Sequence, residues 1–133
     1  MPLHASKTLS ISIDRHCDEV YEFVSNPANL PQWARGLCRS VRKSNGGWIA
    51  ETPQDPVKIL FTERNDLGVV DHYVFTPAGE ETYVPLRVVP NGTGAEVLFT
   101  VFRPSGMTDE RFAEDAAMVA RDLETLKRLL EDN

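Results

Sequence analysis

Cysteine is scarce in this chain, and no stretch is both apolar enough and long enough to span a membrane. Cys17 and Cys38 are the two cysteines among 133 residues, and neither belongs to a CxxC or Cys/His pattern that would hold a metal or a redox disulfide. The N-terminus lacks the apolar run of a signal peptide. We therefore expect a cytoplasmic protein with free thiols, without a metal and without a cofactor.

Positive charge is also in the minority. The chain carries 14 Lys and Arg against 20 Asp and Glu, a net charge of −6, and it has no long basic run. Nucleic acid and anionic membranes attract basic surfaces, so neither is an expected partner, and we expect no membrane insertion. The hydrophobic content of 41% is ordinary for a globular protein, and the length predicts one domain over residues 1–133.

The C-terminal segment contains the strongest pattern in the sequence. Six apolar residues recur at steps of four and three and form one stripe on a helix: Phe112, Ala116, Val119, Leu123, Leu126 and Leu130. Thr108 is a suitable N-cap. Acidic residues in the first turn and basic residues near the last turn interact favourably with the helix dipole. The pattern predicts a helix over Thr108–Glu131, which needs a long apolar surface to cover its stripe.

An antiparallel sheet would supply that surface. Leu9, Ile11 and Ile13 alternate with polar residues and predict a first strand, after which a helix follows from Asp18 to about Ser25 and a short helical segment over Pro27–Arg35. Turn signals such as Asn45-Gly46 and Asn65–Gly68 then separate six predicted strands: Leu37–Lys43, Trp48–Thr52, Val57–Arg64, Val69–Thr76, Thr82–Val89 and Ala95–Arg103. The order predicts an α+β fold in which the terminal helix covers one face of the sheet.

Several of these segments carry a family resemblance. Ile11-Ser12-Ile13, the run Asp18–Val24, Asn26-Pro27 and Pro31-Gln32-Trp33 resemble the opening of the START, birch-pollen-allergen and polyketide cyclase superfamily, called SRPBCC. The resemblance implies a helix-grip fold: a curved seven-stranded sheet wrapped around the long C-terminal helix, with a cavity between them. Members bind lipids, sterols, polyketides and other apolar molecules there, and some cyclise or dehydrate them. No catalytic signature of a known branch is present, so the resemblance concerns the fold more than the function.

Hairpin register sorts the side chains onto two faces, and the more apolar face should point towards the terminal helix. The predicted neighbours on this inner face are Phe61 with His72, Ile59 with Val74, Glu63 with Val70, His72 with Leu86, and Val74 with Val84. On the outer face they are Thr62 with Asp71, Leu60 with Tyr73, and Asp71 with Arg87. An error of one residue in either turn would exchange the two faces.

Two polar residues, Glu63 and His72, fall on the inner face as diagonal neighbours. Burial raises the pKa of a carboxyl group and a nearby carboxylate raises that of a histidine, so such a pair is a candidate for general acid/base catalysis near neutral pH. A structural pair, or a Glu63 that reaches solvent, is the alternative. If the faces are exchanged, Asp71, Tyr73 and Arg87 form the polar cluster of the cavity; otherwise Asp71 and Arg87 form a surface salt bridge worth about 0–1 kcal/mol.

The predicted ligand-binding residues lie on the inner face or near the ends of the cavity: Trp33, Ile59, Phe61, Val74, Leu86, Phe99, Arg103, Asp115 and Val119. Trp33 would gate the cavity or plug it. Arg103 would meet an anionic group of a ligand or pair with an acid of the terminal helix, and Asp115 would lean into the mouth of the cavity or remain in solvent.

Three functions remain open at this point. The first is binding of a small hydrophobic molecule of lipid, polyketide or aromatic type in the cavity. The second is an enzyme similar to polyketide cyclases and dehydratases that uses Glu63 and His72. The third is a protein-interaction module with a filled core.

Overall fold

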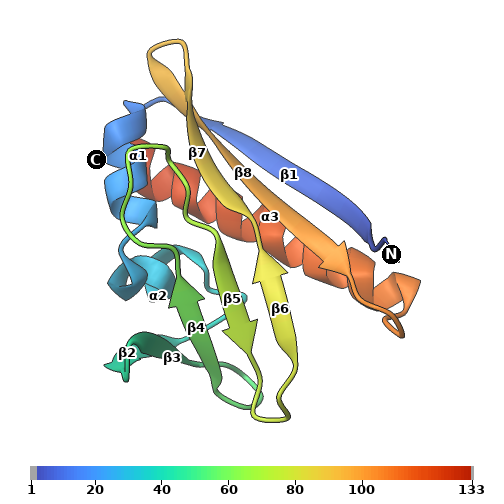
Figure 1. The fold of residues 1–133 in the computed structure, drawn as a ribbon. Helices are drawn as coiled ribbons and strands as arrows, with labels where there is room; N and C mark the ends of the chain where they lie inside the picture. Colours follow the sequence, from blue (N-terminus) through green and yellow to red (C-terminus); the bar gives the residue numbers. More distant parts are fainter. Residues whose placement is uncertain (1–2, 133) are drawn as a thin grey trace.

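The computed structural model describes residues 3–132. The described residues form eight strands and four helical segments, and Figure 1 shows their arrangement. In chain order they are β1 (Ala5–Ile13), α1 (Cys17–Val24), the 3-10 helix η1 (Pro27–Asn29), α2 (Leu30–Trp33), β2 (Ser40–Ser44), β3 (Gly47–Glu51), β4 (Val57–Phe61), β5 (His72–Phe75), β6 (Glu81–Val84), β7 (Leu86–Asn91), β8 (Gly94–Arg103) and α3 (Asp109–Glu131). None of the helices among the described residues is long and apolar enough to cross a bilayer.

The predicted C-terminal helix is confirmed. Thr108 caps α3, and its hydroxyl oxygen accepts a hydrogen bond of 3.1 Å from the Arg111 N–H. The apolar stripe faces the core, but it is not buried evenly: Leu123, Leu126 and Leu130 are buried, whereas Phe112 near the start of α3 is half-buried. The stripe is therefore buried from Ala116 onward, and only the start of α3, at Phe112, is packed less tightly.

The strands form two antiparallel sheets, so the prediction of one seven-stranded sheet is wrong. One sheet has the order β1-β8-β7 and the other has the order β2-β3-β4-β5-β6. The predicted strand Thr82–Val89 is divided at Pro85 into β6 and β7. Proline has no N–H to donate to a neighbouring strand, and the chain leaves one sheet for the other at this residue.

A second interruption lies in residues 62–71, where the predicted strands Val57–Arg64 and Val69–Thr76 are shortened to β4 and β5. This segment crosses to β7, where the Val88 N–H donates to the Gly68 carbonyl at 2.8 Å and the Val70 N–H donates to the Leu86 carbonyl at 2.8 Å. Gly68 has a φ of 72°, and a Cβ at this position would collide with the Val88 carbonyl oxygen. These contacts join the two sheets along a seam, and only glycine fits the closest approach.

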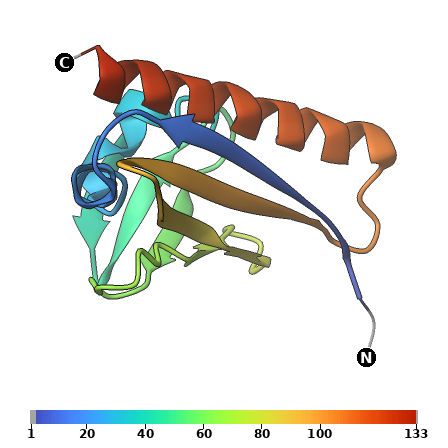
Figure 2. The same ribbon diagram turned by 90° about the horizontal axis from the view of Figure 1, so that it is seen from above.

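The position of α3 defines the interior of the protein. Its main contacts are with β1, β8 and α2. Figure 2 shows α3 running lengthwise beside β1 and β8, with β4 and β5 on the opposite side of the molecule. The buried core therefore lies between α3 and the sides of both sheets that face the interior, and Ile13, Val97 and Leu126 are among its fully buried residues.

Candidate functional site

The inward face of the sheets is the first part of the candidate site. We use this name for the side chains that point into the interior from four strands: Ile59, Phe61, His72, Val74, Leu86 and Phe99. The register between β4 and β5 confirms two predicted pairs, Ile59 with Val74 and Phe61 with His72. Ile59 and Leu86 are fully buried, whereas Phe61, Val74 and Phe99 pack against the core but are only partly buried.

The register between β5 and β6 differs from the prediction by two residues. His72 pairs with Val84 and Val74 pairs with Thr82, in place of the predicted partners Leu86 and Val84. Side chains alternate along a strand with a period of two, so a shift of two residues changes the partners but leaves each side chain on its predicted face. The faces are therefore not exchanged, and Tyr73 points outward with 43% exposure.

His72 lies on the inward face at the start of β5 and is only 6% exposed. Its Nδ1 is 3.0 Å from the Val70 carbonyl oxygen. The Phe61 ring lies 4.9 Å away and the Phe99 ring 6.5 Å away, measured between ring centroids. Burial in this apolar surrounding lowers the pKa of His72 below its ordinary value of 6.5, although the hydrogen bond to Val70 and the charge of Asp71 oppose the shift. The imidazole is therefore neutral at pH 7.

The predicted hydrogen-bonded pair of Glu63 and His72 is not formed. β4 ends at Phe61, and the Thr62 N–H and hydroxyl both donate to the Asp71 carbonyl oxygen, at 2.9 and 2.7 Å. Beyond this point the chain leaves the sheet, and Glu63 is exposed. Within residues 3–132, no hydrogen bond or ion pair joins the two side chains. The diagonal geometry required β4 to continue for two more residues.

Asp71 lies beside His72 but belongs to a different polar cluster, with Tyr83 and Arg87. Although only 8% exposed, it accepts four hydrogen bonds: from Tyr83 Oη at 2.8 Å, the Leu86 N–H at 2.9 Å, Arg87 Nε at 3.0 Å and Arg87 Nη2 at 2.7 Å. Burial alone would raise the pKa of Asp71, but these donors outweigh it and hold the pKa at about 2. The contact between Asp71 and Arg87 is confirmed. However, the prediction of a solvated surface pair is wrong, because the carboxylate is buried.

A pocket of about 460 Å³ opens between the N-terminal half of α3 and the loops at the β3–β4 and β5–β6 ends of the larger sheet. We call it the mouth pocket. It is lined by Gly36, Leu37, residues 52–55, Val57, residues 76–78, Glu80, Arg111, Asp115 and Met118. Asp115 is thus placed at this opening, where its carboxylate lies 3.1 Å from Arg111 Nε. The volume is in the range of small-molecule sites.

The other predicted binding residues lie in different settings. Val119 is buried in the core, and Trp33 is 2% exposed. Arg103 donates to the Met107 carbonyl at 2.9 Å and forms an ion pair with Asp109 at the start of α3. Its guanidinium therefore secures the turn into the helix, which corresponds to the second of the two roles considered for it.

Asp122 is a buried acid whose setting could not be read from the sequence. The helical pattern places it at the edge of the apolar stripe, yet it is 8% exposed and accepts a hydrogen bond of 3.1 Å from the Gly36 N–H. Burial raises its pKa to about 6, although the Gly36 N–H and the charge of Arg121 oppose the shift. Asp122 thus ties α3 to the loop that forms one wall of the mouth pocket.

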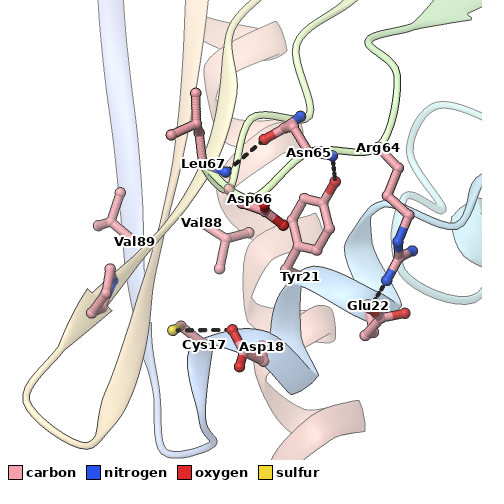
Figure 3. Close-up of a pocket in the computed structure, with 12 residues that line it drawn as sticks. Cys17, Asp18, Tyr21, Glu22, Arg64, Asn65, Asp66, Leu67, Val88 and Val89 are labelled. Atoms are coloured by element: carbon pink, nitrogen blue, oxygen red, sulfur yellow. Dashed lines mark hydrogen bonds and ion pairs between the residues drawn. The ribbon is translucent and has the colours of Figure 1, made fainter.

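A second pocket of about 760 Å³ lies outside this interior, between α1, residues 64–68 and β7 (Figure 3). The polar side chains that line it are largely hydrogen-bonded or ion-paired with neighbouring residues of the pocket. Tyr21 Oη accepts from the Asn65 N–H at 2.9 Å, and Arg64 pairs with Glu22 while lying 5.5 Å from the centre of the Tyr21 ring. No sequence signal pointed to this pocket, because its walls come from segments that are distant in the chain.

The α1 end of this second pocket also brings together His16, Cys17 and Asp18. One potential ligand atom from each lies within 4.8 Å of the others. However, His16 Nδ1 already accepts the Asp18 N–H at 3.1 Å as the cap of α1, and His16 and Asp18 are exposed. The cluster is explained by helix capping.

Comparison with known proteins shows a likeness in structure only. No protein-family model and no curated protein matches the sequence. Among solved structures, Aha1 from Colwellia psychrerythraea, described as a dimer, has a TM-score of 0.77 at 15% identity over 96% of both chains. Ara h 8.0201 has a TM-score of 0.68 at 10% identity, over 97% of this chain and 99% of that one. DynU16, from the dynemicin biosynthetic locus, has a TM-score of 0.73 at 17% identity, over 98% of this chain and 48% of that one.

These likenesses are consistent with a helix-grip arrangement of antiparallel strands and a long C-terminal helix. At such low identities they establish the fold alone, and the residues of the site must carry the functional argument.

Proposed function

We propose that this protein binds a small, largely apolar molecule between the inward face and α3, and that the molecule enters through the mouth pocket. The observation that carries the proposal is the incomplete burial of this interior. Phe61, Val74, Phe99 and Val101 contact the core but keep accessible surface, and the start of α3 above them is loosely packed. Close-packed interiors leave few voids, so this accessible apolar surface favours a binding site. Val57, which lies on the same face of β4 as Ile59 and Phe61, lines the opening of about 460 Å³ and connects it to the inward face.

Electrostatics supports an apolar occupant. His72 is neutral at pH 7, and the Asp71 carboxylate is held by its own donors in a separate cluster. The remaining members of the inward face are aliphatic or aromatic. A charged ligand would lose its hydration there without a fixed partner, whereas an apolar one would gain roughly 25 cal/mol for each Å² buried.

The cyclase or dehydratase alternative lacks the pair of residues that motivated it, because Glu63 lies in solvent and does not reach His72. The catalytic roles of Glu63 and His72 therefore remain predictions without a supporting contact. The interaction-module alternative requires a filled interior, which the following experiment measures directly.

The experiment compares two tryptophan substitutions on one strand. Val74→Trp adds a large side chain to the inward face, and Tyr73→Trp makes a similar addition to the outward face of β5. The probe is 2-methoxynaphthalene, and its dissociation constant is measured by fluorescence titration. We expect Val74→Trp to weaken binding at least tenfold and Tyr73→Trp to leave it unchanged.

The same variants test whether the interior is already full. In a filled interior Val74→Trp would cost about 1–3 kcal/mol of stability through overpacking, and the wild-type protein would not bind the probe. That pair of results would exclude the binding function. Native mass spectrometry of gently purified protein provides an independent check for a co-purifying small molecule.

A further inference from the structure

The protonation of His72 follows from its one hydrogen bond. A carbonyl oxygen can only accept, so Nδ1, which lies 3.0 Å from the Val70 carbonyl oxygen, must carry the hydrogen. The second nitrogen of a neutral imidazole is then an acceptor with a free lone pair. His72 therefore offers an acceptor, Nε2, from the inward face of the sheet.

No group of the described residues satisfies this acceptor. Across residues 3–132, the side chain of His72 makes no hydrogen bond other than the one to Val70. The rings nearest to it belong to Phe61 and Phe99, and its cross-strand partner in β6 is Val84. None of these side chains has a donor.

Nε2 is not sealed inside the core. In the described part of the chain, the side-chain polar atoms that are both fully enclosed and without a partner are Ser25 Oγ and Trp33 Nε1. An unpartnered Nε2 outside this set must contact open space, and His72 retains 6% exposure. A molecule that covers Nε2 without offering a donor loses about 1–3 kcal/mol of binding free energy, whereas a molecule that brings a donor to Nε2 avoids that loss.

From these observations we infer that His72 Nε2 recognises a hydroxyl group on the bound molecule, and that this molecule is an aromatic alcohol or phenol. The inference rests on the proposed function, because it requires a ligand in the interior. The hydroxyl donates to Nε2, and the aromatic body contacts Phe61 and Phe99, whose ring centroids lie 4.9 and 6.5 Å from that of the imidazole. The histidine acts in recognition, and no proton transfer is needed.

The test uses two probes that differ only in the donor, 2-naphthol and its methyl ether 2-methoxynaphthalene. Dissociation constants of both are measured for the wild-type protein, for His72→Phe and for Tyr73→Phe. His72→Phe replaces the imidazole by a ring without an acceptor, and Tyr73→Phe removes a polar group from the outward face of the same strand.

We expect the preference for 2-naphthol over its ether to fall about fivefold in His72→Phe, the ratio that about 1 kcal/mol gives at 25 °C. The preference should be unchanged in Tyr73→Phe. If the ether binds the wild-type protein but the preference is the same in His72→Phe, the hydroxyl inference is overturned and the proposed binding function stands. If neither probe binds the wild-type protein, both are overturned.

A measurement on the wild-type protein covers the case in which His72→Phe does not fold. The ¹⁵N resonances of the imidazole report which nitrogen carries the hydrogen. We expect Nε2 to be unprotonated in the free protein, and its resonance to move on addition of 2-naphthol but not of the ether. A hydrogen on Nε2 in the free protein, or equal responses to both probes, would contradict the inference.

Discussion

Replacing Asp71 with asparagine should destabilise the protein, and the loss should depend on pH in a defined direction. The native pKa of Asp71 is about 2, below the ordinary value of 3.8. Each pKa unit corresponds to 1.36 kcal/mol. The contribution of ionised Asp71 to the free energy of unfolding therefore has an upper limit of about 2.4 kcal/mol. The Arg87 side chain is 47% exposed, and solvent screens its charge, so we expect about 1–2 kcal/mol from the ionised form.

The direction in which stability changes with pH follows from proton linkage. The unfolded chain binds a proton at Asp71 more readily than the native protein does, so the stabilisation is fully present above about pH 5. It is lost as the pH falls from about 4 towards 2. In Asp71→Asn this contribution is absent at every pH, so the stability difference between wild-type and variant proteins should narrow over that interval.

The assay is urea unfolding of both proteins at several pH values, read as the free energy of unfolding. Asp66→Asn is the matched control, because Asp66 is exposed and its loss changes the net charge equally. A difference at pH 7 no larger than that of the control would refute the argument. So would a difference of constant size between pH 7 and pH 2.5, because the hydrogen bonds would then not depend on the ionised carboxylate.

Three other substitutions or reactions test particular contacts. Asp122 has a native pKa of about 6, above its ordinary value, so its contribution to stability falls as the pH rises from 4 to 6. Asp122→Asn keeps an acceptor for the loop amide, and urea unfolding should show it to be about 1–2 kcal/mol more stable than wild type at pH 7.5 but not at pH 4. Gly68 and Gly79 both have positive φ, but only a Cβ at Gly68 would strike the β7 backbone. Gly79→Ala should therefore cost about 1–2 kcal/mol, and Gly68→Ala should cost clearly more; equal melting temperatures would contradict the close approach. Burial raises the pKa of Cys38 to about 11, and it is 1% exposed, so a thiol reagent should modify only Cys17 in the native protein and both cysteines in urea. Rapid native modification of Cys38 would contradict its burial.

Periodicity along the chain predicted much of the fold, because it depends on residues that are close in sequence. The stripe from Phe112 to Leu130 predicts the long helix, and Thr108 caps it as expected. The turn over residues 65–68 predicts the pairing of Phe61 with His72. These features need only the helical repeat of 3.6 residues and the strand repeat of two.

Tertiary structure decided the rest, because the remaining features depend on segments that are distant in the chain. Hairpin register could pair Asp71 with Arg87 on the outer face, but it could not reveal that Tyr83 and the Leu86 N–H would also donate to the Asp71 carboxylate or that the carboxylate would be buried. It could place His72 on the inner face, but not show that β4 ends before Glu63.

The physical reason is that a repeat of two assigns faces without assigning neighbours. The break between β6 and β7 at Pro85 and the shift of two residues between β5 and β6 leave each side chain on its predicted face. They change the residue that lies opposite it on the neighbouring strand. Hydrogen bonds and pKa values depend on those partners. The sequence by itself therefore determined which side chains of the sheets point inward, and only the folded chain decided which polar groups are paired and that the Nε2 of His72 has no partner among the described residues.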